Sequence, residues 1–244
     1  IDIMFSRVRG TNFKGWQAQL NGKTIQKIIE QKIKKILKEK ITLIGSGRTD
    51  SGVHAFEQSA HFDCKKKIEN IEKFIKSINF FLNDHLISIL NIKKKNMNFH
   101  ARYSAKMRIY KYVIFNRNSK PSIYRNRGWH LKNKLNINFM RKGAKKLIGT
   151  NDYSTFRSSS CNAKSPIRSI KSIKIFKSNN IIYIRFMSQS FLQQQVRSMV
   201  GCLKYLGEGK WDLKKFVKVF YSKKRILCAP PAPAEGLFLE KVIY

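Results

Sequence analysis

The feature of this sequence that most constrains its fold is a repeated alternation of extended segments and amphipathic helical segments. In the first half, apolar residues spaced three and four apart predict one helix over residues 25–37 and another over 68–82. Short apolar or alternating segments predict strands at residues 4–8, 41–44, 58–62 and 86–92. The resulting order of strand, helix, strand, strand, helix, strand is that of a ferredoxin-like unit.

The second half repeats this alternation with one additional helix. Segments rich in β-branched and aromatic residues predict strands at 109–115, 170–176, 181–186 and 237–243. Apolar spacing predicts helices at 139–148 and 191–206, and Asp212 is placed to cap a further helix. We therefore predict an α+β fold of two ferredoxin-like halves, residues 1–104 and 105–244. Their strands should form a largely antiparallel sheet with the helices on one face, which leaves the other face, or a cleft between the halves, open to a ligand.

The chain is strongly basic, with 50 lysines and arginines against 14 aspartates and glutamates and a formal net charge of +36. A surface of this charge attracts polyanions such as nucleic acids and speeds their capture. The 36 lysines outnumber the 14 arginines and accompany 30 isoleucines, a mixture that an AT-rich genome produces in any protein. We attribute roughly half of the charge to this compositional bias, because a nucleic-acid footprint should be localised.

The spacing of cysteines and histidines gives no indication of a metal site. The four cysteines contain no C-x-x-C pair, and the five histidines show no H-E-x-x-H spacing. The cysteines are Cys64, Cys161, Cys202 and Cys228. Reduced thiols in a cytoplasmic protein are the simplest interpretation of such separated cysteines. No apolar run approaches the length of about 18 residues that a membrane-spanning helix needs, so we expect no membrane insertion.

A glycine-rich turn at residues 45–52 contains one carboxylate, Asp50, two residues after Arg48. The turn matches neither G-x-x-x-x-G-K-[ST] nor G-x-G-x-x-G, and an acid would repel a phosphate. One interpretation is structural, with the aspartate side chain hydrogen-bonding its own backbone. The other is catalytic, with arginines keeping Asp50 ionised as a nucleophile that attacks an electrophilic carbon. The neighbouring acids form no D-x-D or E-x-x-E pair, so glycoside hydrolysis and two-metal nuclease chemistry are not suggested.

Six segments of the chain, in order, resemble the TruA-type tRNA pseudouridine synthases. The most specific of them is GSGRTDSGVHA at residues 45–55. The other five are GTNFKGWQAQ (10–19), FHARYSAKMRIYKYVIFN (99–116), GTNDYSTFR (149–157), SFLQQQVRSMVG (190–201) and PAPAEGLFLEKV (231–242). Together they extend over nearly the whole chain, and their common order is hard to reconcile with coincidence.

The resemblance implies a function and assigns roles to individual residues. It implies that Asp50, in the N-terminal half, is the catalytic nucleophile. In the C-terminal half, Tyr110 would pack against the target base and assist proton removal from its C5, and Arg197 would pair with Asp50. Arg48 would help to hold the site open to RNA. The family consists of homodimers without cofactor or metal, which convert uridines 38, 39 and 40 of the tRNA anticodon stem-loop to pseudouridine.

Arg197 also has a physical reason to pair with an acid. It lies in the apolar stripe of the helix predicted at 191–206, and an unpaired buried charge costs several kcal/mol. We therefore predict Asp50 as its partner, and we interpret His54 and His100 as structural residues.

The chain departs from the family pattern at two places. Val8-Arg9-Gly10 stands where the family usually has Tyr-Asp-Gly, and Gln193 and Gln194 occupy positions that are aromatic or histidine in the family. We expect these departures to affect RNA contacts more than the reaction itself.

Two other interpretations stay open. One is a non-catalytic RNA-binding module, although residues 108–115 lack the glycine of an RRM segment. The other is a degraded synthase that binds tRNA without turnover. The sequence also does not decide whether Asp50 attacks C6 of uracil or C1′ of the ribose.

Overall fold

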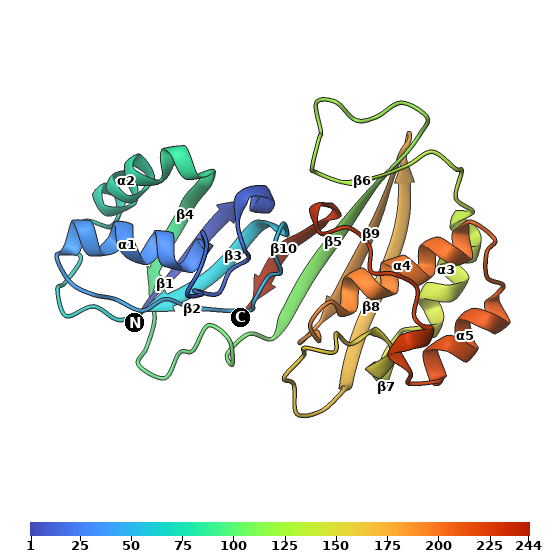
Figure 1. Cartoon of the computed structure of the whole chain (residues 1–244). Helices are drawn as coiled ribbons and strands as arrows, with labels where there is room; N and C mark the ends of the chain where they lie inside the picture. Colours follow the sequence, from blue (N-terminus) through green and yellow to red (C-terminus); the bar gives the residue numbers. More distant parts are fainter. The chain divides into compact units, whose positions relative to one another are not determined.

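The computed structural model describes all residues, 1–244, and contains five α-helices and ten strands. The chain divides into two compact units, one formed by Ile1–Lys106 with Leu239–Tyr244 and the other by Met107–Phe238. Figure 1 shows the elements of both units, coloured along the sequence. None of the helices has the length and apolar character needed to span a bilayer.

The first unit contains the six elements predicted for residues 1–104, in the predicted order, and in addition most of the chain's last strand, which was predicted for the other half. Its elements are β1 (Asp2–Val8), α1 (Ile25–Leu37), β2 (Ile44–Gly45), β3 (His54–Phe62), α2 (Ile71–Leu82), β4 (Ile87–Lys94) and most of β10 (Leu237–Ile243). Strands β4, β1, β3 and β10 follow one another across its sheet, and β2 also pairs with β3. β1 is antiparallel to both β3 and β4, as in a ferredoxin-like unit.

The second unit repeats this arrangement with additional elements. They are β5 (Met107–Asn116), β6 (Trp129–Leu131), α3 (Ile137–Lys146), β7 (Gly149–Asp152), β8 (Ile167–Ser178), β9 (Ile181–Ser188), α4 (Gln195–Gly207) and α5 (Leu213–Tyr221). Strands β5, β9, β8 and β7 are antiparallel neighbours, and β6 pairs in parallel with β5. The order β5-β9-β8 corresponds to β1-β3-β2 of the first unit, so the predicted α+β fold with two related halves and a largely antiparallel sheet is confirmed.

Each unit has its own core between strands and helices. In α1, the isoleucines at positions 25, 29 and 33 are buried, which places them on one face at the predicted helical spacing. In the second unit, Tyr112, Ile184 and Ile175 are cross-strand neighbours on the buried face of the sheet. Figure 1 shows α3 and α4 lying side by side over these strands, and α3 contacts β8.

Side chains of α1 shorten the second strand of the first unit. The strand predicted at 41–44 is reduced to Ile44–Gly45. The Leu43 N–H donates to Glu30 Oε1 (2.8 Å), and the Leu43 carbonyl accepts from Gln26 Nε2 (3.0 Å). These contacts direct the N–H and C=O of Leu43 toward side chains of α1 rather than toward a neighbouring strand.

Backbone conformation at one helix and a capping side chain at another determine where two helices of the second unit begin. The helix predicted from residue 191 begins at Gln195, because Gln194 adopts the left-handed conformation with φ 60°. Asp212 caps α5 as predicted, since its Oδ1 accepts from the Lys215 N–H at 2.7 Å.

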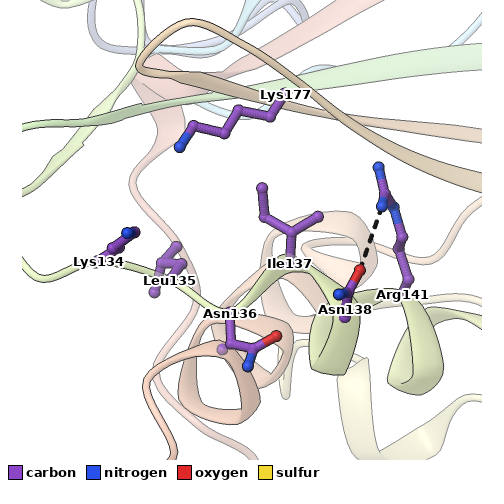
Figure 2. A pocket seen from close by; sticks show the side chains of 8 residues that line it. Lys134, Leu135, Asn136, Ile137, Asn138, Arg141 and Lys177 are labelled. Atoms are coloured by element: carbon purple, nitrogen blue, oxygen red, sulfur yellow. Dashed lines mark hydrogen bonds between the residues drawn. The ribbon is translucent and has the colours of Figure 1, made fainter.

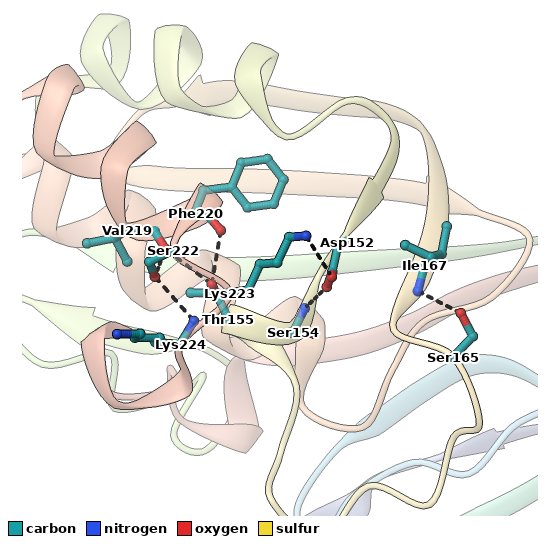
Figure 3. Close-up of polar contacts among 10 residues, drawn as sticks. All are labelled: Asp152, Ser154, Thr155, Ser165, Ile167, Val219, Phe220, Ser222, Lys223 and Lys224. Carbon is teal, nitrogen blue, oxygen red and sulfur yellow. Dashed lines mark hydrogen bonds and ion pairs between the residues drawn. The ribbon is translucent and has the colours of Figure 1, made fainter.

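The segment GTNDYSTFR ties β7 to the end of α5 (Figure 3). The buried Thr155 hydroxyl lies 3.1 Å from the Val219 carbonyl oxygen and 3.0 Å from that of Phe220. Asp152 forms an ion pair with Lys223, with 3.6 Å between Oδ2 and Nζ. These contacts give this segment a structural role within the second unit.

Candidate active site

Asp50 lies in a tight turn immediately before β3. The turn is closed by the Val53 N–H, which donates to the Asp50 carbonyl at 3.2 Å, and Gly52 has the positive φ of 80° that its third position requires. The backbone therefore closes this turn by its own hydrogen bond. The Asp50 side chain is half-buried, and Arg48 is exposed to solvent.

The loop at residues 10–16 holds the backbone on both sides of Asp50. Before Asp50, the Thr49 carbonyl accepts from the Trp16 N–H at 3.1 Å. After it, the Phe13 carbonyl accepts from the Ser51 hydroxyl at 3.0 Å and from the Gly52 N–H at 3.4 Å. These bonds fix the peptide groups around Asp50 and so restrict the direction in which its carboxylate extends.

Glycines in the 10–16 loop permit this close backbone approach. A Cβ at Gly10 would lie 1.9 Å from the Val53 carbonyl oxygen, and one at Gly15 would lie 2.6 Å from that of Thr49. Gly15 also has a φ of 84°, which other residues rarely adopt. The Gly10 N–H donates to Nδ1 of the buried His54 at 3.0 Å. His54 thus joins the loop to β3, in keeping with the structural interpretation of this residue.

A buried glutamine shapes the backbone that precedes the turn. Gln58 on β3 accepts from the Ser46 hydroxyl at 2.8 Å through Oε1 and donates to the Gly47 carbonyl at 3.1 Å through Nε2. The residue is 1% exposed, so these hydrogen bonds are shielded from water. Sequence reasoning did not identify Gln58, although a polar residue inside a predicted strand beside the motif was an available indication.

Tyr110 lies on β5 and is buried on the same face as Tyr112. Its ring meets that of Phe191 edge to face, with centroids 5.4 Å apart and an interplanar angle of 88°. Its neighbour on β9 is Phe186. The aromatic contact fixes the plane of the phenol ring, and Phe191 is a further site residue that sequence reasoning did not single out.

Arg197 lies in the first turn of α4 and is held by the segment at residues 230–233. Its Nε donates to the Ala232 carbonyl at 2.8 Å, and the Ala232 N–H donates back to the Arg197 carbonyl at 3.0 Å. Gly201 allows the segment to lie against the helix, because a Cβ there would be 2.1 Å from the Pro230 carbonyl oxygen. One edge of the guanidinium is thereby fixed.

Tyr112 supports the same segment from the sheet. Its hydroxyl donates to the Pro233 carbonyl at 2.8 Å. Burial raises the pKa of Tyr112 well above that of a free phenol. Tyr112 therefore stays neutral and keeps the proton that this hydrogen bond needs.

The residues that depart from the family pattern have structural partners. The Gln193 carbonyl accepts from the Ser158 N–H at 3.1 Å, and Gln194 forms the left-handed cap of α4. The Arg9 N–H donates to the Leu86 carbonyl at 3.1 Å, next to the start of β4. Each departure therefore lies at a junction between elements.

The predicted site residues divide between the two units. Asp50 and Arg48 belong to the first unit, and Tyr110 and Arg197 belong to the second. The pairing of Arg197 with Asp50 stays a prediction. No group of three His, Cys, Asp or Glu residues is arranged to hold a metal ion. Chemically, the chain offers a carboxylate on a fixed turn, a phenol on a strand and a guanidinium on a helix.

Comparison with known proteins points to one family. The sequence model of the family described as tRNA pseudouridine synthase matches residues 4–104 and 144–244. The chain is 69% identical over 235 residues to tRNA pseudouridine synthase A of Pelagibacter ubique (strain HTCC1062), covering 96% of each protein. It is 41% identical over 235 residues to proteins of the same name from Thermoanaerobacter sp. (strain X514) and Thermoanaerobacter pseudethanolicus, again over 96% of each. Asp50 lies in the first matched stretch, Arg197 in the second and Tyr110 between them.

Proposed function

Because this chain belongs to the tRNA pseudouridine synthase family, we propose that it converts uridine to pseudouridine at positions 38, 39 and 40 of the tRNA anticodon stem-loop, with Asp50 as the nucleophile. The observation that supports this role most directly is the turn at Asp50, whose flanking peptide groups are hydrogen-bonded to the 10–16 loop. A carboxylate on a fixed backbone meets a bound substrate in a restricted orientation, which favours attack at one carbon.

The reaction exchanges one bond for another within a single nucleoside. The N1–C1′ bond breaks, the uracil ring turns and a C5–C1′ bond forms, while C5 loses its hydrogen and N1 gains one. Asp50 forms a transient bond to carbon, either to C6 of the ring or to C1′ of the ribose, and is released at the end. A uridine within a stem must first be turned out of the helix to reach the carboxylate.

The remaining site residues have complementary roles in this proposal. Arg197 pairs with Asp50 and orients its carboxylate toward the substrate. Tyr110 packs against the turned-out base with its ring and receives the C5 proton through its hydroxyl. Arg48, which is exposed, contacts the RNA backbone and helps to hold the site open.

We also propose that the active form is a homodimer. On the other face of the second unit's sheet, Phe176 and Tyr183 are cross-strand neighbours on β8 and β9. Phe176 is 45% exposed and stacks on Tyr183 with centroids 5.0 Å apart. A second copy of the chain would cover this aromatic pair, as oligomer interfaces do. Sedimentation equilibrium of Phe176→Glu should then show a monomer where the wild type is a dimer, and a dimeric variant would contradict this choice of interface.

The cytoplasm is the compartment we propose, because thiols stay reduced there. Cys202 and Cys228 lie with their sulfur atoms 3.5 Å apart as thiols. Non-reducing mass spectrometry of protein isolated under acid quench should find both as free thiols.

The experiment that tests the proposed function is tritium release from tRNA transcripts labelled at uridine C5. Formation of the C5–ribose bond expels that hydrogen, so release should occur with the wild type and stop with Asp50→Asn. Asp84→Asn is the matched control, because Asp84 is an exposed acid of the same unit, and it should release tritium at the wild-type rate. If the wild type binds tRNA without releasing tritium, the chain is an RNA-binding module or an inactive synthase.

A further inference from the structure

A basic hollow lies in the second unit, where α3 begins (Figure 2). Its volume is about 590 Å³, and it is widely open to solvent. Its lining includes Lys134, Ile137, Asn138, Arg141, Lys177 and Gly207. Three cations reach it from three different segments, namely the loop before α3, α3 itself and the end of β8.

The loop that carries Lys134 is held in place by one buried side chain. Asn116 Nδ2 donates to the Leu131 carbonyl at 3.1 Å and to the Asn133 carbonyl at 2.8 Å, and its Oδ1 accepts from the Leu135 N–H at 3.1 Å. The peptide groups on both sides of Lys134 are therefore fixed. This distinguishes Lys134 from the many lysines that extend from exposed helix surfaces.

Arg141 is fixed in a similar way on the other side of the hollow. Its Nε donates to the Ile175 carbonyl at 3.0 Å, which holds the guanidinium beside β8. Its Nη1 lies 3.4 Å from Asn138 Oδ1. Figure 2 draws this contact as a dashed line. An arginine held through Nε still presents N–H groups of its fork to a ligand, and that fork matches the geometry of a phosphate.

The charge of the hollow is not balanced by its own lining. No aspartate or glutamate lines it. The nearest acid along the chain is Glu208, and its carboxylate is already paired with Lys204 at 2.8 Å and with Lys210 at 3.2 Å. Three cations around one space repel one another, and an anion placed between them would relieve that repulsion.

The hollow does not depend on the free N–H groups of a helix end. Asn136 caps α3 by accepting from the Phe139 N–H at 3.1 Å. The partners of an anion would instead be the cationic side chains, while Ile137 lies between them and offers an apolar surface to a sugar or base. This combination suits a nucleic-acid backbone better than a free inorganic anion.

The hollow is also separated from the candidate catalytic residues of the same unit. Gly207 is the last residue of α4, whereas Arg197 lies in its first turn, ten residues earlier. At about 1.5 Å per residue, these positions are roughly 15 Å apart along the helix axis. A ligand in the hollow is therefore not the nucleotide that meets Arg197.

We propose that the basic hollow binds a backbone phosphate of the tRNA substrate, away from the nucleotide that reacts. This inference rests on the proposed function, since it takes tRNA as the substrate. A phosphate contact at this distance would fix the register of the RNA without reading its sequence.

The test compares two double variants that remove the same charge. Lys134→Ala with Lys177→Ala empties the hollow of two cations, and Lys145→Ala with Lys146→Ala removes two exposed cations from the last turn of α3. The dissociation constant for an unmodified tRNA transcript is measured between about 50 and 200 mM salt, the range in which phosphate contacts are most evident. Circular dichroism and the melting temperature confirm that both variants are folded.

For the Lys134→Ala, Lys177→Ala variant, the dissociation constant should rise about five- to tenfold at 0.1 M salt. The slope of the logarithm of this constant against the logarithm of the salt concentration should fall by about one. The control pair should change the constant less than about twofold and keep the wild-type kcat. Equal dissociation constants and slopes for the two double variants would overturn the inference. Tritium release by the wild type is scored separately, so failure of the proposed function is distinguishable from failure of this contact.

Discussion

Asp50 lies in a turn whose neighbouring peptide groups are hydrogen-bonded to a second loop, whereas Tyr110 and Arg197 lie on a strand and a helix. The residues on both sides of Asp50 are held by hydrogen bonds to the 10–16 loop, as between the Trp16 N–H and the Thr49 carbonyl at 3.1 Å and between the Ser51 hydroxyl and the Phe13 carbonyl at 3.0 Å. Around the other two residues the contacts involve the functional side chains themselves. The Tyr110 ring packs on Phe191, and Arg197 Nε donates to the Ala232 carbonyl.

This difference shows two ways of positioning a reactive group. A short side chain such as aspartate has few atoms for packing, so its position depends on the peptide groups that flank it. Longer side chains can be held by their own atoms on regular elements. The Asp50 turn should accordingly be sensitive to glycine substitutions in the 10–16 loop, and the second unit to substitutions of the functional side chains.

The largest expected effect comes from Asp50→Asn, which keeps the shape of the side chain and removes the nucleophile. Turnover of tRNA should fall at least about a thousandfold, while the dissociation constant stays within a few fold of the wild type. Single-turnover kinetics and filter binding measure the two quantities. Turnover within tenfold of the wild type would exclude Asp50 as the nucleophile.

Tyr110→Phe separates the two roles proposed for the phenol. The ring alone can stack on a base, which is worth about 1–3 kcal/mol, whereas proton transfer needs the hydroxyl and contributes about 10²–10⁴ in rate. We expect normal tRNA binding with at least a hundredfold loss of turnover, and a deuterium isotope effect at C5. If Tyr110→Phe is as fast as the wild type and only Tyr110→Ala fails, Tyr110 acts by stacking.

Arg197→Met tests the predicted pairing with Asp50. Losing the cation should lower kcat about tenfold or more at neutral pH, because the carboxylate loses the charge that orients it. Arg197→Lys keeps the positive charge and should lose less. A kcat of Arg197→Met within about twofold of the wild type would contradict the pairing.

Gly15→Ala tests whether the backbone of the 10–16 loop positions Asp50. Gly15 has φ 84° and close contact with Thr49, whereas Gly209 has φ 74° and open space around it. Both alanine variants should lose at least about 1 kcal/mol of unfolding free energy, because both place a side chain in the left-handed region. Gly15→Ala should lose more than that, because its Cβ would lie 2.6 Å from the Thr49 carbonyl oxygen. Only Gly15→Ala should also lose kcat/KM, by about tenfold. Equal activities in the two variants would show that the loop does not position the carboxylate.

The smallest expected effect concerns the pH dependence of stability in the first unit. Burial lowers the pKa of His61, and nearby His100 lowers it further. The Ala101 N–H donates to His61 Nδ1 at 3.0 Å, a bond that needs this nitrogen unprotonated. The folded state therefore binds fewer protons than the unfolded state, and stability falls as pH drops below about 6.5.

The measurement is hydrogen exchange of each unit between about pH 7 and 5.5, corrected for intrinsic exchange, with His61→Gln as the comparison. The first unit of the wild type should lose protection on acidification, and the variant should lose less. The His61→Gln variant should still lose some protection on acidification, because burial also lowers the pKa of His85 in the same unit. Equal losses in both proteins would show that His61 does not contribute.

Most of the element order was predictable, because it depends on local spacing of apolar residues. The helix over 25–37 and the last strand over 237–243 have their predicted bounds. The errors lie where a distant or special contact overrides the local pattern. Glu30 and Gln26 take the backbone of Leu43 out of β2, and the left-handed Gln194 delays the start of α4.

Candidate residues for the reaction were also accessible from the sequence, because the motif around Asp50 has a distinctive composition. The residues that support them were not. Phe13 and Ala232 act through their main-chain carbonyls, and such contacts leave little trace in the side-chain type. Gln58 acts through its side-chain amide, but its partners, Ser46 and Gly47, are 12 and 11 positions away on another segment.

By itself, the sequence determined the family, the element order and the set of residues able to perform the reaction. Only the tertiary structure decided which groups hold them, since Gly10 meets His54 across 44 positions and Arg197 meets Ala232 across 35. It also decided that Leu239–Tyr244 belongs with the first unit, where the Tyr244 hydroxyl donates to the Ala101 carbonyl 143 positions earlier. Local patterns arise from neighbours within a few residues, whereas these contacts form only when the folded chain brings distant backbone groups within hydrogen-bonding distance.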